Sequence, residues 1–273
     1  MKSKKLLSVI VGIMCMVLLA GAVSVYAGEA ASDLAAIQDK GVLVVGITDF
    51  APMDYKDENG NWIGFDAELA EAFAEIIGVD VEFQEIDWDN KILELNAGSV
   101  DCIWNGMTLT EEVAEAMECT GTYALNAQVV VMKADKLADY ADAESMADLS
   151  FAVEAGSAGE AVAQEAGFEI NSVQNQAAAL MEVAAGTSDA CVIDKTMADA
   201  MTGEGTSYAD LGYAVSLSSE EYVVGFRKGS DAAAALDEKI QEWIKDGTMA
   251  EISAKYDNAV SIAEARDAAE EAE

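Results

Sequence analysis

The chain has 273 residues, of which 52% are hydrophobic and one is proline, so it is a globular protein long enough for two α/β lobes or one large domain. Acidic residues outnumber basic ones by 51 to 15, giving a formal charge of −36. This charge argues against nucleic-acid binding, because phosphate contacts require clustered Lys and Arg. The absence of histidine excludes Ser–His and Cys–His catalysis and removes the commonest zinc ligand. We expect neither metal nor cofactor.

Residues 1–27 have the pattern of a signal peptide. Three lysines precede an apolar run from Leu6 to about Val23, and Val25-Tyr26-Ala27 fits a small-x-small cleavage site. An uncleaved anchor is the alternative, because the run is long for a signal peptide. Lipidation of Cys15 is disfavoured, because a methionine precedes it where a small residue is needed. We expect export to a periplasm or to the cell surface.

The mature chain opens with a helix, a strand and a hairpin. An Ala-rich segment from Ala30 to Lys40 predicts a short helix that Gly41 ends. The continuous apolar run Val42–Ile47 predicts a strand buried on both faces. Residues 54–65 then predict a hairpin, because Asn59-Gly60 is a strong turn signal.

A helix and an alternating strand are expected next. Asp66 is predicted to cap the helix, and Gly78 to end it. Apolar and polar residues alternate over Val79–Ile86, which predicts a strand. A second helix is expected over Lys91–Ala97.

The stretch Ser99–Val113 combines a buried strand, polar residues and a helix start. We expect the strand over Asp101–Trp104, a loop over Asn105–Thr108 and a helix beginning at Thr110. Small ligands bind in open α/β sheets where strands end before helix N-termini. The sequence therefore predicts a ligand site here.

A sequence pattern that occurs twice predicts two lobes with the same α/β arrangement. Leu95–Ile103 and Val183–Val192 share the order helix end, Gly, two residues, Asp and buried strand. The second lobe is expected over residues 126–218, and the first over residues 28–125 and 219–257. Residues 258–273 are expected to form a loose acidic tail.

Two crossings between the lobes, near Asn126 and Ser218, make a two-strand hinge. Loops from both lobes would then face a cleft that can close around a small ligand. After the second crossing, an amphipathic helix containing Leu236 and Ile240 is expected.

Several segments together resemble the solute-binding proteins of ABC importers, in the polar amino-acid branch known as family 3. They are Gly46–Met53, Asp57–Asp66, Asp87–Asn90, Asn105–Thr110, Gly186–Ala190, Asp194 and Tyr222–Lys228. They occur in family order and cover nearly all of residues 38–257. The resemblance implies a periplasmic-binding-protein type II fold with venus-flytrap closure. It also implies delivery of a ligand to permease transmembrane subunits, without catalysis. We expect a monomer.

The resemblance also implies which residues bind the side chain and ammonium of a ligand. Phe50 and Trp88 occupy the positions of two rings that sandwich the ligand side chain. Asp194 matches the acid that pairs with the α-ammonium, and a carboxylate at a strand end needs such a partner. Asp49 lies in the first loop, near where ligand side chains end, although a solvated aspartate is the simpler interpretation.

Further positions correspond to groups that hold the ligand backbone. Asn105, Gly106 and Thr108 match residues that contact the α-amine and α-carboxylate. Ser157 and the N–H groups at the following helix start form an anion site. The hydroxyl that the family places next is absent, because the residue is Ala158.

One departure from the family pattern concerns the carboxylate itself. The family has an arginine that forks onto the ligand carboxylate, and here the position is Val113. One explanation is an amino-acid ligand that is bound weakly or held by Lys195 or another recruited group. The other is a ligand without a carboxylate, such as an amine, which Asp49, Asp54 and Asp194 would favour.

Two other functions remain open. An enzyme on this fold, such as a lyase that dehydrates a small carboxylic acid, could use Asp49 and Asp194 as acid and base. A sensor that has lost transport is the second alternative. The sequence also leaves open whether Cys102 and Cys119 are joined, with Cys191 as the remaining thiol.

Overall fold

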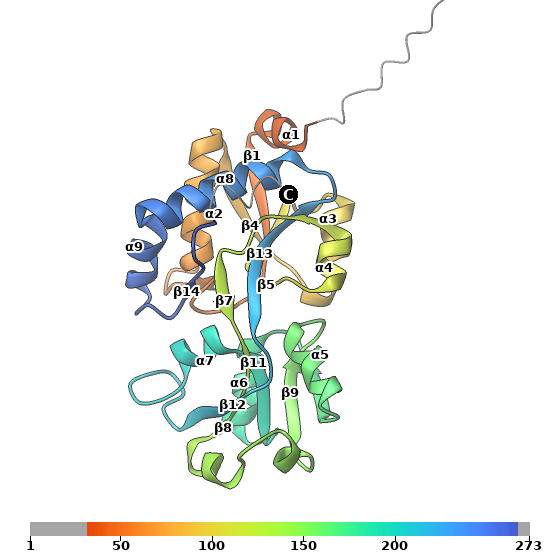
Figure 1. Cartoon of the computed structure of the whole chain (residues 1–273), viewed down its shortest axis with the longest axis vertical. Helices are drawn as coiled ribbons and strands as arrows, with labels where there is room; N and C mark the ends of the chain where they lie inside the picture. The colour runs from red at the N-terminus through yellow and green to blue at the C-terminus, as the bar shows by residue number, and fades with distance from the viewer. Residues whose placement is uncertain (1–31, 267–273) are drawn as a thin grey trace, which may run out of the picture. The chain divides into compact units, whose positions relative to one another are not determined.

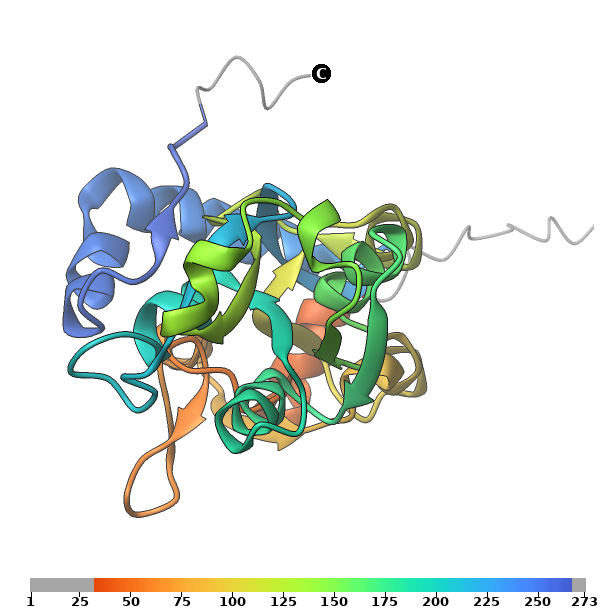
Figure 2. The same ribbon diagram turned by 90° about the horizontal axis from the view of Figure 1, so that it is seen from below.

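The computed structural model describes residues 32–266, so the expected signal peptide lies outside the described residues. The described chain is α/β, with two main sheets and helices packed around each (Figure 1). A small hairpin of β2 (Tyr55–Lys56) and β3 (Trp62–Ile63) forms around the predicted turn and projects from the body of the protein (Figure 2).

The first lobe is built on a seven-stranded sheet. Its strands are β1 (Val42–Ile47), β4 (Asp80–Glu85), β5 (Cys102–Thr108), β6 (Met117–Cys119), β7 (Ala124–Asn126), β13 (Glu220–Arg227) and β14 (Ser261–Ile262). They lie in the order β14-β7-β13-β5-β1-β4, and β6 also pairs with β13. Its helices are α1 (Asp33–Lys40), α2 (Phe65–Ile77), the 3-10 turn η1 (Trp88–Asn90), α3 (Lys91–Ala97), α4 (Glu111–Ala116), α8 (Asp231–Asp246) and α9 (Thr248–Lys255).

The second lobe is built on a five-stranded sheet in the order β10-β9-β11-β8-β12. Its strands are β8 (Gln128–Lys133), β9 (Ser150–Glu154), β10 (Glu169–Val173), β11 (Ala190–Asp194) and β12 (Leu211–Ser216). Its helices are η2 (Ala134–Asp139), η3 (Glu144–Met146), α5 (Ala158–Glu165), α6 (Gln176–Ala185) and α7 (Lys195–Met201). The chain passes between the sheets from β7 to β8 and from β12 to β13 (Figure 1).

The apolar runs and glycine stops were reliable guides to local structure. β1 spans the predicted Val42–Ile47. α2 and α3 end at Gly78 and Gly98, both of which adopt the left-handed conformation that favours glycine. The prediction that Asp66 caps α2 was wrong, because the helix begins at Phe65.

Asp66 is instead fully buried inside the first lobe. Its carboxylate accepts hydrogen bonds from the Gly106 backbone N–H and the Tyr123 hydroxyl, each at 2.7 Å. Burial raises its pKa to about 7. This aspartate therefore supports the strand that carries the predicted ligand site.

Two expected irregular segments are ordered. β5 continues through Thr108, because Met107 and Thr108 pair with β13 beyond an irregularity in the register. The described part of the tail is not loose: β14 pairs with β7, and Ala263 is buried. Residues 267–273 lie outside the described range.

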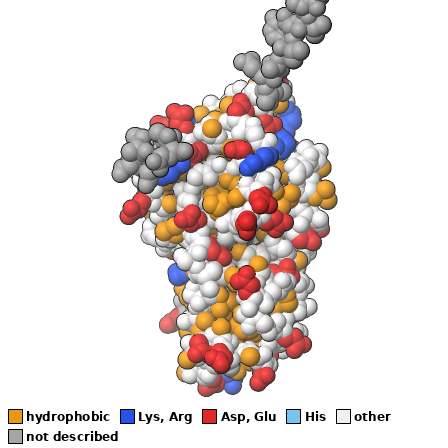
Figure 3. Space-filling view, turned by 45° about the vertical axis from the view of Figure 1, so that its right-hand side comes forward, with side chains coloured by type: hydrophobic (Ala, Val, Ile, Leu, Met, Phe, Trp, Pro, Cys, Tyr) orange, Lys and Arg blue, Asp and Glu red, His pale blue; other side chains and the backbone are white. Residues whose placement is uncertain are grey.

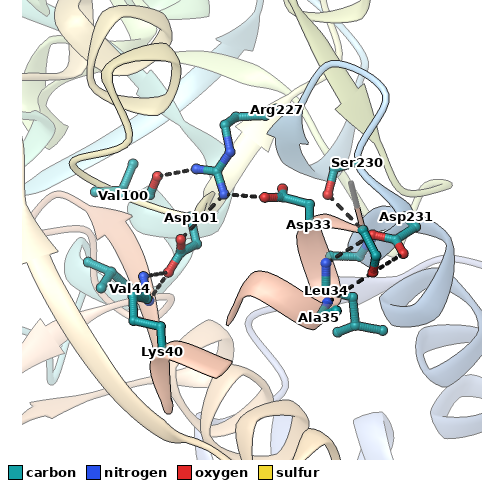
Figure 4. A network of polar contacts seen from close by, with 12 residues as sticks. Asp33, Leu34, Ala35, Lys40, Val44, Val100, Asp101, Arg227, Ser230 and Asp231 are labelled. Atoms are coloured by element: carbon teal, nitrogen blue, oxygen red, sulfur yellow. Dashed lines mark hydrogen bonds and ion pairs between the residues drawn. The ribbon is translucent and has the colours of Figure 1, made fainter. Parts of the chain in front are cut away.

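A polar network fastens α1 to the first sheet (Figure 4). Arg227 at the end of β13 donates to Asp33 Oδ1 at 2.6 Å and to the Val100 carbonyl at 2.9 Å. Asp101 accepts from Lys40 Nζ at 2.5 Å and from Arg227 Nη2 at 3.4 Å. The network joins residues far apart in sequence, so it depends on the folded first lobe.

The described surface is mainly acidic, as the composition predicts, and the described cysteines are unpaired. Acidic side chains are scattered over the face in Figure 3, where basic ones are few. Cys102, Cys119 and Cys191 are free thiols, so Cys102 and Cys119 are not joined. Among residues 32–266, no helix has the length and hydrophobicity needed to cross a bilayer.

Candidate functional site

A cavity of about 250 Å³ lies where the first lobe meets the second. It is lined from the first lobe by residues on η1, α3, β5 and α4, and from the second lobe by the last residues of β9 and β11 and by residues at or before the starts of α5 and α6. Seven of the eight predicted site residues line it: Phe50, Trp88, Asn105, Gly106, Thr108, Ser157 and Asp194. The eighth, Asp49, is half-buried and lines a separate cavity of about 880 Å³.

The Asn105 side chain is committed to the first lobe. Its Oδ1 accepts from the Thr48 N–H and hydroxyl at 3.0 and 2.9 Å. Its Nδ2 donates to the Thr48 carbonyl at 3.2 Å and to Asp54 at 2.8 Å. These four bonds use the full capacity of the amide, so Asn105 can offer a ligand only its main chain. Asp54 is fully buried behind it and does not line the cavity.

Gly106 brings the strand close to two rings. Its φ of +54° lies in the left-handed region. A Cβ would stand 2.6 Å from Phe50 Cε1 and 3.3 Å from the Tyr222 ring. A side chain is therefore excluded both by backbone strain and by the packing of Phe50.

Asp194 ends β11 and points into a network of neutral donors. Its Oδ1 accepts from the Tyr222 hydroxyl at 2.6 Å and from Asn126, and its Oδ2 accepts from Gln176. Burial raises its pKa to about 7, and the nearby Glu220 carboxylate contributes further. The side chain is 5% exposed, so a cationic ligand at the cavity would compensate a largely buried acid.

The structure adds a second carboxylate that the sequence reasoning missed. Glu154 ends β9, is 2% exposed and lines the cavity. Burial raises its pKa to about 8, with a further contribution from Asp194. The strand-end position that singled out Asp194 applies equally to Glu154, which directly follows a buried apolar run. That signal was present in the sequence.

Lys91 is the one basic side chain among the described residues that line the cavity. Its Nζ donates to the carbonyls of Trp88 and Gly156, at 3.3 and 2.9 Å, and lies 5.0 Å from the centre of the Trp88 ring. Burial lowers its pKa. Lys195, suggested above as a recruited anchor, does not line this cavity and pairs with Asp199.

The two departures from the family pattern face this cavity. Val113 is the third residue of α4, whose N-cap is Thr110, and Ala158 begins α5 after the N-cap Ser157. Val113 is 2% exposed and packs in an apolar cluster with Trp88 and Met107. The Ser157 hydroxyl already accepts from the Glu160 N–H at 3.0 Å.

Within the part of the chain that the structure describes, no cluster of His, Cys, Asp or Glu side chains could hold a metal ion. The cavity lining offers carboxylates, backbone groups, two rings and the ammonium group of Lys91. This chemistry suits a small polar or cationic organic molecule.

The chain belongs to the bacterial extracellular solute-binding proteins, family 3, whose family model matches residues 43–259. The chain is similar to the L-cystine-binding protein TcyJ of Escherichia coli, with 24% identity over 90% of this chain and 94% of that protein.

Two solved structures share the fold. An ABC uptake transporter substrate binding protein from Streptococcus pneumoniae with bound histidine gives a TM-score of 0.75 at 30% identity, covering 83% of this chain and 96% of that one. An ancestral amino acid-binding protein, described as a precursor of cyclohexadienyl dehydratase, gives 0.76 at 30% identity, covering 82% and 99%. The predicted two-lobe type II fold is confirmed.

Proposed function

We propose that this solute-binding protein is the extracytoplasmic component of an ABC importer and holds a small polar or cationic, amino-acid-like ligand in the cavity between its lobes. The observation that carries the proposal is Asp194, a buried carboxylate that lines the cavity opposite two aromatic residues of the first lobe. Trp88 and Phe50 supply apolar and cation–π contacts, and Asp194 supplies the opposite charge. The relatives above that are named for cystine or hold histidine support an amino-acid-like ligand.

Binding to a permease, export and a monomeric state are parts of the same proposal. Family membership supports the first two. Mass spectrometry of the secreted protein should give a mature chain that starts at Gly28, and light scattering should give one chain per particle. A retained N-terminal segment would instead favour an anchored protein, including the sensor alternative.

A thermal-shift panel of amino acids and amines on residues 28–273 tests ligand binding. A ligand that binds the folded state alone stabilises it by about 2.7 kcal/mol at a hundredfold excess over its Kd. A shift with a cationic or polar amino-acid-like compound is the expected result. The absence of a shift with every compound would contradict the proposal.

A second candidate function is dehydration of a small carboxylic acid. It is favoured by the raised pKa of Glu154, which keeps a proton on this cavity side chain near neutral pH, and by the similarity to a dehydratase precursor. Against it, the basic cavity residue Lys91 already donates to two carbonyls. Turnover of small hydroxy acids by the purified protein would establish this alternative, and we expect none.

A further inference from the structure

We infer that Glu154 is a second cation-binding residue of this cavity, and that the ligand is an amine or guanidine without a carboxylate group. This inference rests on the proposed function and narrows it to one ligand class. Glu154 is not among the site residues that the sequence predicted. The inferred ligand also differs from the α-amino acid that the family resemblance leads one to expect.

The first step is the state of the Glu154 carboxylate. The side chain is 2% exposed and borders the cavity, and hydrogen bonding from Gln176 and Thr48 offsets part of the rise in pKa that burial causes in its carboxyl group. Its Oε1 is nevertheless buried without a hydrogen-bond partner within residues 32–266. A buried acceptor without a partner is costly, so its presence beside the cavity calls for an explanation. A ligand N–H group in the cavity would supply the missing donor.

The second step is the pairing of Glu154 with Asp194. The two strand ends, of β9 and β11, are neighbours in one sheet. Charge repulsion from Asp194 adds to the raised pKa of Glu154, and repulsion from Glu220 adds to that of Asp194. Gln176 donates to Asp194 and lies beside Glu154. One cation between the two acids would relieve this repulsion and pair with both.

The third step concerns the other charged groups that face this position. The positive charge of Lys91, on α3, acts on Glu154, but its ammonium donates to the backbone carbonyls of Trp88 and Gly156. No ion pair joins Lys91 to Glu154 in the described part of the chain. The acid therefore keeps its capacity for an external cation.

The fourth step is the lack of side-chain donors for a ligand carboxylate. The positions that would bind it carry Val113 and Ala158, whose side chains have no donor, so only backbone N–H groups at the start of α5 are left there for a carboxylate. Glu111 and Glu112, next to Val113 at the start of α4, also line the cavity. A ligand carboxylate would meet two like charges and no arginine, which is a repulsive element against amino acids.

The test uses matched pairs that differ by one carboxylate: agmatine and arginine, cadaverine and lysine, putrescine and ornithine. Kd values are measured by calorimetry at pH 7 for the mature wild-type chain, for Glu154→Gln and for Glu169→Gln. Glu169 is exposed on β10 and does not line the cavity, so it controls for the loss of one negative charge.

We expect at least one amine to bind tenfold or more tightly than its amino acid. Glu154→Gln should weaken that amine roughly ten- to a hundredfold, while Glu169→Gln leaves it unchanged. The melting temperature of Glu154→Gln without ligand should equal or exceed that of wild type, because a buried unpaired acid is removed. Amine binding should also release protons at pH 7, measured as a dependence of the binding enthalpy on the buffer.

Several outcomes would overturn the inference. If amino acids bind as tightly as the matching amines, the inference is wrong but the proposed function stands. Lys91 would then be the expected partner of the ligand carboxylate. An unchanged amine affinity in a folded Glu154→Gln variant would remove the role of Glu154. Binding of neither class would contradict both the inference and the proposed function.

Discussion

Replacing Val113 by arginine should shift the cavity from amines toward α-amino acids. Val113 lies in the first turn of α4 and lines the cavity, so a longer side chain there can reach a ligand. A bidentate, charge-assisted contact to a carboxylate contributes about 1.5–3 kcal/mol, which is roughly a ten- to hundredfold gain in affinity for an amino acid. An amine cannot make this contact, and a new positive charge repels it.

The same substitution should lower the stability of the fold. Val113 is 2% exposed and packs with Trp88 and Met107, and burial of such a side chain contributes about 1.5–3 kcal/mol. Part of this loss would be offset if the guanidinium pairs with Glu111 or Glu112. The two effects have opposite signs, so ligand affinity and stability can be separated.

Calorimetry with arginine and agmatine at one pH and one salt concentration gives the selectivity ratio. Val113→Met serves as the control, because it lengthens the side chain without adding charge. The ratio of the agmatine Kd to the arginine Kd should rise at least tenfold in Val113→Arg and remain near the wild-type value in Val113→Met. A folded Val113→Arg variant with an unchanged ratio would refute the argument that the missing arginine sets selectivity.

Three further predictions concern stability and closure. Asp101→Asn should lower the free energy of unfolding, measured in urea, by about 1–3 kcal/mol, because it weakens the contacts to Lys40 and Arg227. Ligand affinity should not change. Unchanged stability would contradict the role of the network. Without ligand, stability should fall from pH 5 to pH 8. The folded-state pKa values of Glu154, about 8, and of Asp66 and Asp194, about 7, lie above their usual values of 4.5 and 3.8, so the folded state binds more protons over this range; a rise in stability with pH would argue against these shifts. Gly156→Ala should weaken ligand binding, because a Cβ would stand 2.5 Å from Asp89 Cα and push apart the two loops that flank the cavity. Its control is Gly167→Ala, which has a similar positive φ but no atom within 4 Å of the added Cβ, and an equal loss of affinity in both variants would indicate backbone strain alone.

Local structure followed the sequence closely where one physical rule dominated. The continuous apolar run of β1, the Asn59-Gly60 hairpin and the glycine-terminated helices α2 and α3 are decided by burial and by backbone conformation. Asp66 shows where such rules fail. A cap residue and a buried helix residue have the same local signature, and only the packing of α2 against β5 decides that Asp66 holds Gly106.

The candidate site was partly predictable for the same reason. Residues that follow buried strands, such as Asp194, were found from the pattern, and the same pattern contained Glu154. The state of Asn105 could not be foreseen, because its amide bonds to Thr48 and Asp54, which lie 57 and 51 positions away in sequence. A residue's type can be read from the sequence, but its free hydrogen-bonding capacity cannot.

The sequence by itself determined the family pattern, the two α/β lobes and the missing carboxylate anchor at Val113, since these depend on residue types at given positions. Tertiary structure alone decided which charges share the cavity. It places Glu154 with Asp194, brings Lys91 to the rim of the second lobe, and leaves Asp49 and Asp54 off the cavity. The physical reason is that charge and hydrogen-bond complementarity arise from side chains on different strands and lobes, which meet only when both sheets have folded and packed.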